Sequence, residues 1–482
     1  MRSLSFVDCL QFRDLCTSTS RNLCLYDVDN DGDNELIVGL WDSGPILENG
    51  EPDAAHITGS IYVVKGHKLW KANHQLGMIL CVTAGTVTDA GVPWILALCA
   101  DSGCYVFDAL SDANEPLIHR EHHSVCGVKN QTKEKLQLLP LKMIHNQLLA
   151  FNARDVCLIE SGGAHDMAVA YSDRVVRLYT WCPAEKAPSD SSNRGKFVIL
   201  IKWELAGQVN RIATHWTPKF ETMLIASQPG GGFAVLQRKF EKYNDLIVPT
   251  LVYYPPCVAN TRNAEARTWI AGNVRGKPPA TVSQSSFRSL DNASEDDQHI
   301  APTISSIMAV CTADGTVMLV DPTADDKKRV LWCAQLHVRG ELFGLSKFNL
   351  TKGETDEVCA CAWDGTTYVF NDRRELFRFQ LGQSCQAFTA GWFAVEPGRN
   401  EPVLVYVTCD HNLLVYYNLN VDHLVEHSLY DELCHREDLV AKLRRLNVDI
   451  LNRAEVQKTI RYLLYEHPKS TKTDCNTDHC LP

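Results

Sequence analysis

A short pattern recurs seven times along the chain: a tight-turn signal followed by an alternating run of strand-forming residues. The runs occupy residues 59–64, 103–108, 174–179, 232–236, 315–320, 365–370 and 412–417. Turn dipeptides such as Asp314-Gly315 and Asp364-Gly365 precede most of them, and another β-rich run usually lies upstream. Each copy therefore predicts a β-hairpin whose second strand begins just after the turn.

The spacing of these turns indicates one repeated architecture. Successive copies begin 44, 71, 58, 83, 50 and 47 residues apart, and the three short spacings match a four-stranded propeller blade of about 40–50 residues. The long spacings contain polar stretches near 111–135, 183–196 and 238–298. We interpret them as loop insertions, because the entropy cost of closing a loop grows slowly with its length. The sequence therefore predicts an all-β, seven-bladed β-propeller over residues 1–427.

The periodicity changes from strand to helix after about Asp422. Apolar residues then recur at helical spacing in two stripes: Leu429, Leu433, Leu439, Leu443 and Leu446, followed by Val456, Ile460, Leu463 and Leu464. Residues 452–455 resemble a capping box, and Pro468 would end the second helix. We therefore expect a C-terminal α-helical hairpin at 428–468 and a disordered tail at 469–482. The stripes suit packing against the propeller or docking of a partner, and the two roles can coexist.

The most specific motif is an acidic loop, Asp-Val-Asp-Asn-Asp-Gly-Asp-Asn-Glu at 27–35, which runs directly into a β-rich segment. Carboxylates at its first, third, fifth and ninth positions, with Gly32 at the sharp turn, suit a hard cation such as Ca²⁺. The candidate ligands are Asp27, Asp29, Asp31, Asp33 and Glu35. The motif is not an EF-hand, because Val38 stands at position twelve and the flanks are strand-like. The alternative is a turn capped by Asp and Asn side chains without a metal.

Composition and motifs argue against several classes of function. The net charge of −11 provides no overall positive field for nucleic-acid binding. The N-terminus shows no signal peptide, and no apolar run of about 18 residues predicts a membrane span, so we expect no membrane insertion. Several of the 19 cysteines lie in apolar strand-like runs, namely Cys81, Cys99, Cys311, Cys359 and Cys361. Such positions are typical of buried thiols in the reducing cytosol. No nucleophile, zinc or phosphate-loop motif predicts a catalytic residue.

Four segments, at 27–39, 171–177, 360–368 and 404–408, resemble in order the integrin-alpha FG-GAP repeat-containing family that supplies a subunit of the KICSTOR complex. The segment Ala-Cys-Ala-Trp-Asp-Gly at 360–365 is distinctive, whereas the acidic loop alone would indicate any FG-GAP propeller. Two further loops keep the frame of the acidic loop with too few carboxylates to hold Ca²⁺ well: Glu160 and Asp166 in one, and Glu357 in the other. These two loops and the insertions depart from the family pattern.

The resemblance implies a non-catalytic scaffold that pairs with a kaptin-like propeller subunit and with the large KICSTOR scaffold subunit. Such a complex recruits the GATOR GTPase-activating complex to the lysosomal surface and restrains mTOR complex 1 when nutrients are scarce. A cytoplasmic chain recruited to lysosomes is then expected, with no cofactor required and Ca²⁺ left open at the first FG-GAP loop. The alternative from the acidic loop is a calcium-stabilised, integrin-like adhesion or binding propeller. An enzyme on a propeller scaffold would need converging acids or histidines, and the sequence shows no such set.

Overall fold

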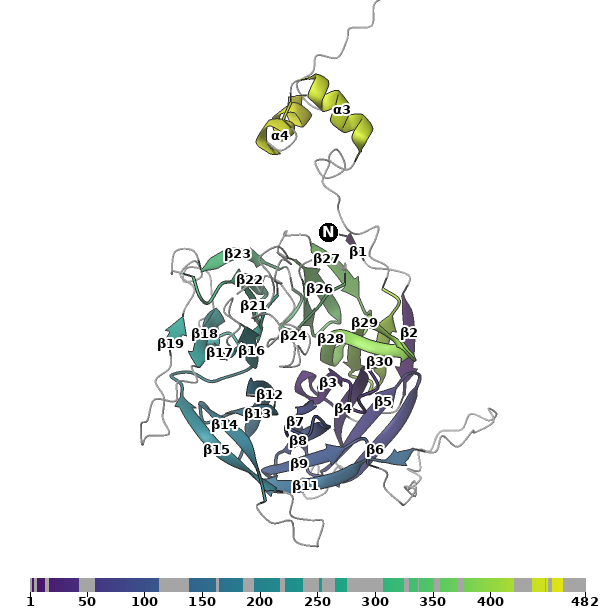
Figure 1. Ribbon diagram of the computed structural model, residues 1–482, viewed down its shortest axis with the longest axis vertical. Helices are drawn as coiled ribbons and strands as arrows, with labels where there is room; N and C mark the ends of the chain where they lie inside the picture. The colour runs from purple at the N-terminus through teal and green to yellow at the C-terminus, as the bar shows by residue number, and fades with distance from the viewer. Residues whose placement is uncertain are drawn as a thin grey trace, which may run out of the picture. The chain divides into compact units, whose positions relative to one another are not determined.

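The computed structural model describes residues 2–3, 7–13, 17–42, 57–111, 138–161, 164–184, 195–216, 222–236, 251–253, 265–274, 307–324, 329–336, 338–350, 356–371, 376–419, 436–446, 448–449 and 453–462. The chain divides into two compact units, Met1–Leu424 and Val425–Pro482. The first unit is a ring of seven β-sheets around a common axis (Figure 1). This is the seven-bladed propeller that the sequence predicts, so the predicted fold class is confirmed.

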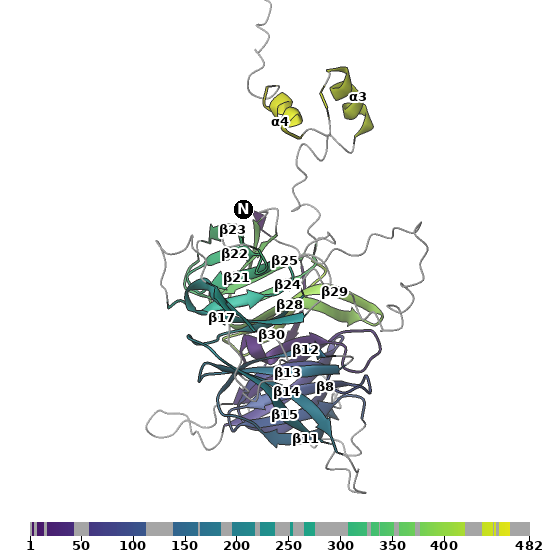
Figure 2. The same cartoon turned by 60° about the vertical axis from the view of Figure 1, so that its left-hand side comes forward.

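Each blade is an antiparallel sheet whose strands follow one another outward from the centre of the ring. Blades 1 to 3 comprise β3 (Leu23–Tyr26), β4 (Glu35–Asp42), β5 (Thr58–Lys65) and β6 (Lys68–Leu76); β7 (Ile79–Thr86), β8 (Pro93–Cys99), β9 (Gly103–Asp108) and β11 (Lys142–Leu148); and β12 (Ala153–Ser161), β13 (Ala164–Tyr171), β14 (Val175–Pro183) and β15 (Gly195–Glu204). Figure 2 shows blade 3 with β12 to β15 stacked in this order. The seven predicted hairpins are the second and third strands of the seven blades.

Blades 4 to 7 complete the ring with the same arrangement. They comprise β16 (Ile212–Trp216), β17 (Thr222–Gln228), β18 (Gly232–Leu236) and β19 (Leu251–Tyr253); β20 (Thr268–Ala271), β21 (Met308–Thr312), β22 (Thr316–Val320) and β23 (Val330–Gln335); β24 (Leu342–Phe348), β25 (Glu357–Ala362), β26 (Thr366–Phe370) and β27 (Leu376–Gln380); and β28 (Cys385–Glu396), β29 (Arg399–Thr408), β30 (Leu413–Tyr417) and β2 (Asp8–Phe12). Single-turn 3₁₀ helices lie at Ser20–Asn22 and Pro229–Gly231.

The ring is closed by the N-terminal segment. Strand β2 pairs antiparallel with β30, from Asp8 opposite Tyr417 to Phe12 opposite Leu413. Strand β1 (Arg2–Ser3) adds in parallel to β27, and β10 (Leu139–Pro140) adds in parallel to β6. Because the last blade takes its outer strand from the start of the chain, closing the ring joins residues about 400 positions apart.

Turn chemistry explains why the hairpins form where they do. In blades 5 and 6 the carboxylates of Asp314 and Asp364 accept the N–H two residues further on, which stabilises the tight turn. Gly365 follows with φ +78°, a conformation that disfavours any side chain. A Cβ atom at Gly365 would lie 2.3 Å from the Gln383 carbonyl oxygen, so the turn requires glycine for space as well.

The hydrophobic core lies between neighbouring blades. All seven residues of β8 are buried, because a propeller strand is covered on both faces by adjacent blades. One cluster joins Trp94 and Leu96 of blade 2 to Met167 and Phe197 of blade 3. The cysteines predicted to be buried are all buried, and the thirteen cysteines of the described residues are free thiols. Burial raises the pKa of the Cys104 thiol to about 12, which keeps it protonated and unreactive.

The expected insertions contribute in part to the ring itself. Strands β19 and β20 lie within 238–298, and β15 begins at Gly195 within 183–196. A blade needs four strands, so part of each of these two stretches supplies strands. Of the three stretches, 112–135, 185–194, 238–250, 254–264 and 275–298 lie outside the described residues.

In the described residues of the second unit there are two helices, α3 (Glu437–Arg445) and α4 (Arg453–Arg461). Leu443, Val448 and Val456 form a small core, against which Ile460 packs. Leu446 is 61% exposed just after α3 ends. Leu429, Leu433, Asn452, Leu463, Leu464, Pro468 and the tail lie outside the described residues. Neither helix is long and apolar enough to cross a membrane.

Candidate metal centre

The acidic loop connects β3 to β4 in blade 1, and its ends are held by the pairing of Tyr26 with Glu35. The Asp27 carboxylate caps the loop from within, accepting the N–H groups of Asp31 at 3.2 Å and Gly32 at 2.8 Å. Gly32 has φ +92°, a left-handed conformation that glycine adopts at low cost. The loop therefore has the side-chain-capped turn that the sequence allowed as an alternative to a metal loop.

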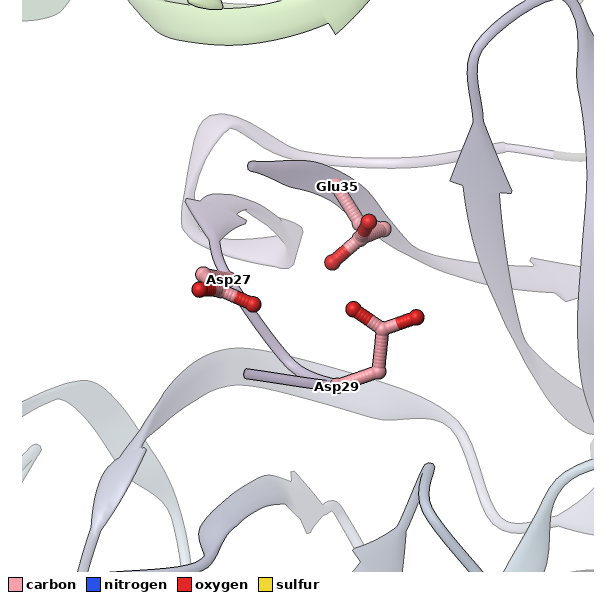
Figure 3. Close-up of side chains that lie close together, drawn as sticks. All are labelled: Asp27, Asp29 and Glu35. Carbon is pink, nitrogen blue, oxygen red and sulfur yellow. The ribbon is translucent and has the colours of Figure 1, made fainter. Parts of the chain in front are cut away.

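The structure brings three of the five predicted ligands together. Carboxylate oxygens of Asp27, Asp29 and Glu35 lie within 4.8 Å of one another. Figure 3 shows Glu35 and Asp29 pointing toward each other, with Asp27 beside them. The side chain of Asp31 is 43% exposed, and its carboxylate contacts the ammonium of Lys65, as the carboxylate of Asp29 does. Asp33 is directed elsewhere.

Asp33 and its neighbour Asn34 join blade 1 to blade 7. Both oxygens of Asp33 accept the N–H of Gly398, at 3.0 and 2.8 Å, in the β28–β29 turn. The Asn34 N–H donates to the Asn400 Oδ1 at 2.7 Å, and the Asn400 Nδ2 donates to the Gly32 carbonyl at 2.8 Å. The loop thus also braces the interface where the ring closes.

The ammonium of Lys65 occupies the centre of the acidic cluster. Its Nζ lies 2.5 Å from Asp29 Oδ2, 2.6 Å from Asp31 Oδ2 and 2.9 Å from Glu35 Oε1. Lys65 is the last residue of β5, and the ring of Trp70 lies 5.1 Å from its charge. The sequence pattern does not reveal Lys65 as part of the cluster, because thirty positions separate it from Glu35. The available signal was the position of Lys65 at the end of β5, because β5 pairs with β4, the strand that follows the acidic loop.

Burial and the ammonium act in opposite directions on the charges of the cluster. Burial raises the pKa of Glu35 to about 7, although Lys65 and the Val28 N–H both favour its charged form. Burial also raises the pKa of Asp29, against the opposing hydrogen bond from Lys65. Burial alone would lower the pKa of Lys65, but hydrogen bonds to Asp29, Asp31 and Glu35 raise it above its usual value. The lysine therefore stays charged and holds the carboxylates together.

Glu35 has a structural task that recurs in another blade. Its Oε2 accepts the N–H of Val28 at 3.0 Å, and Glu357 Oε2 accepts the N–H of Leu350 at 2.7 Å. In both blades the glutamate is the first residue of the second strand. Its side chain accepts a hydrogen bond from the N–H of the residue seven positions earlier, and this bond holds the two ends of the loop together. The loop at 349–357 has too few carboxylates to hold Ca²⁺ well, so the recurrence of the contact there indicates that Glu35 does not require a metal to be placed.

The carboxylate oxygens that do not cap the turn are also suitable ligands for a hard cation. Asp29 Oδ1 is buried and has no hydrogen-bond partner among the residues that the structure describes, and carboxylate oxygens are the ligands that Ca²⁺ prefers. Two conditions oppose a full calcium shell: both oxygens of Asp27 cap the turn, and Lys65 already contacts three carboxylates. Across the described ranges this is the one group of three or more acids, histidines or cysteines arranged for a metal.

Comparison with known proteins agrees with this architecture. The sequence profile of the family described as integrin-alpha FG-GAP repeat-containing protein 2 matches residues 64–421. The KICSTOR complex protein ITFG2 of Mus musculus is 28% identical over 479 residues, which cover 97% of each chain. The Bos taurus protein of the same name is 29% identical over 426 residues, covering 88% of this chain and 73% of its own.

Solved structures give the same fold at low sequence identity. Crystal structures of BBS1N in complex with ARL6DN, soaked with lead or mercury, align with a TM-score of 0.51 at 11% identity. The alignment covers 88% of this chain and 99% or 100% of those chains. This likeness supports the propeller fold alone. The family profile spans most of the ring, and the chain therefore belongs to the integrin-alpha FG-GAP repeat-containing protein 2 family.

Proposed function

We propose that this chain is a non-catalytic scaffold subunit of a KICSTOR-type complex. One observation carries the proposal: the mouse protein named as a KICSTOR complex protein aligns with this chain over 97% of both lengths. An alignment of that extent covers the propeller and the C-terminal unit together, so the proposal concerns the whole chain.

The proposed partners are a kaptin-like propeller subunit and the large scaffold subunit of the complex. Through them the chain takes part in recruiting the GATOR complex to the lysosomal surface, where the assembly restrains mTOR complex 1 when nutrients are scarce. The chain is then cytoplasmic and reaches the lysosome by protein contacts. A propeller ring with many loops and edge strands suits such a role, because it presents several separate surfaces for partners.

The acidic loop has a structural role in this proposal. Lys65 supplies the positive charge that FG-GAP loops otherwise take from a metal, so the fold requires no cofactor. Ca²⁺ then enters only by displacing the ammonium from Asp29, Asp31 and Glu35. The support is the geometry of the cluster together with the engagement of Asp33 at Gly398.

Affinity purification tests the complex directly. The full-length chain, tagged at one terminus, is expressed in cells of its own source, and recovered proteins are quantified by mass spectrometry with cross-links mapped. We expect the KICSTOR subunits to be enriched over a control with the same tag on an unrelated seven-bladed propeller. Recovery of the folded chain without any KICSTOR subunit would overturn the proposal.

A further inference from the structure

A groove between blades 2 and 3 lies apart from the acidic loop. It runs between their outermost strands, β11 and β15, whose ends meet at the lower rim of the ring in Figure 1. The side chain of Gln147 joins the two strands: its Nε2 donates to the Phe197 carbonyl at 2.9 Å, and its Oε1 accepts the Phe197 N–H at 2.8 Å. The groove has a volume of about 510 Å³, within the range of roughly 300–1,000 Å³ typical of ligand sites.

Large apolar side chains are exposed along this groove. Leu148 on its wall is 76% exposed and Ile199 opposite is 42% exposed. Phe151, Leu139 and Met143 are also exposed, but they do not line the groove. Two exposed apolar side chains on facing walls of one groove favour an interaction surface, because apolar area gains free energy when it leaves water.

The charged residues on the groove wall are both cationic. Arg177 Nη2 is paired with Asp173 at 3.0 Å, but its Nη1 is buried without a hydrogen-bond acceptor among the described residues. Lys196 is exposed, and the described part of the chain offers it no ion pair. Asp173 balances the charge of Arg177, so the unbalanced positive charge of the wall is that of Lys196, on a chain whose net charge is −11. A carboxylate placed here would meet two donors.

The edge of β15 decides how an occupant can bind. An outer strand normally presents free N–H and C=O groups that could pair with an added strand. At Phe197 both groups are already bonded to Gln147, so a new strand would find no partner at that point. The groove thus favours insertion of a side chain over addition of a strand.

We propose that this groove docks a segment of a protein partner that carries a large apolar side chain beside a carboxylate. The apolar side chain fills the space between Leu148 and Ile199, and the carboxylate accepts hydrogen bonds from Lys196 and Arg177. The inference rests on the groove alone and holds or fails independently of membership in a KICSTOR-type complex.

The test uses a random-peptide phage library selected on the purified full-length chain. We expect a consensus with Leu, Ile or Phe next to Asp or Glu. A fluorescein-labelled peptide of that sequence is then titrated by anisotropy. Lys196→Glu and Leu148→Ser should each weaken its binding about tenfold, since each removes a contact to the charge or the apolar side chain. The matched controls Lys68→Glu and Leu331→Ser, at exposed positions on other blades, should bind as the wild type does.

A charge exchange sharpens the test. A peptide with Lys in place of its acidic residue should bind Lys196→Glu more tightly than it binds the wild type. Melting curves of all variants should coincide, because every substitution is at an exposed position. The proposal is overturned if no consensus is enriched, if the consensus lacks the acid or the apolar residue, or if Lys196→Glu and Leu148→Ser leave binding unchanged. Self-association of the chain through this rim, seen by sedimentation, would overturn it as well.

Discussion

Replacing Lys65 by methionine removes the charge at the centre of the acidic loop and keeps the length of the side chain. The change leaves Asp29, 15% exposed, facing Glu35, which is fully buried. Breaking a buried ion pair costs about 3–5 kcal/mol. The cost here is reduced, because Lys65 is 27% exposed and Glu35, whose pKa is about 7, can take up a proton. We therefore expect a loss of about 2–3 kcal/mol of unfolding free energy.

The size of the propeller unit makes this a small shift in melting temperature. An unfolding entropy of about 2.1 cal/mol/K per residue over Met1–Leu424 gives about 0.9 kcal/mol/K. A loss of about 2–3 kcal/mol then lowers the melting temperature by about 2–3 °C. Differential scanning calorimetry in EDTA measures this shift. Lys68→Met, an exposed lysine in the same hairpin, is the matched control and should change stability by less than about 0.5 kcal/mol.

A calcium titration separates the two sources of positive charge. Millimolar Ca²⁺ should restore the melting temperature of Lys65→Met, because the vacated position is surrounded by carboxylate oxygens. The wild type should gain less, since Ca²⁺ must first displace the ammonium. Adding Asp29→Ala and Asp31→Ala to Lys65→Met should abolish the response. A Lys65→Met variant that melts like the wild type in EDTA would refute the reasoning, as would a wild type that gains as much from Ca²⁺ as the variant does.

Three further predictions concern the ring and its thiols. Deleting residues 1–12 removes β2 and leaves the edge of β30 unpaired, so calorimetry should show a clear fall in melting temperature; an unchanged melt would contradict closure by this strand. Glu357→Ala should cost about 1–3 kcal/mol by leaving the buried Leu350 N–H without its acceptor, whereas the exposed Glu341→Ala should cost far less, as urea unfolding can measure. Alkylation of the denatured, unreduced protein should modify all 19 cysteines. Among the cysteines that the structure describes, Cys9, Cys333 and Cys409 should react first in the native state because they are exposed; extensive disulfides would instead favour the integrin-like adhesion protein.

Local patterns were sufficient to predict the fold class. The alternation of apolar residues and the Asp-Gly turns at 314–315 and 364–365 depend on neighbours in sequence, so all seven hairpins could be located. The same logic placed the acidic loop between two strands and offered a side-chain-capped turn as an alternative to a metal loop, and the structure shows Asp27 as the capping residue. The strands in 238–298 were missed, because polar residues there resemble a loop more than a blade edge.

Only the tertiary structure decided what the acidic loop does. The sequence by itself determined that carboxylates crowd at 27–35, because their spacing is local. It could not show that Lys65 brings an ammonium to Asp29 and Glu35, or that Asp33 turns to Gly398 in blade 7. Those contacts join residues 30 to about 370 positions apart, and they exist because hydrogen-bonded strands and the closed ring place distant segments side by side.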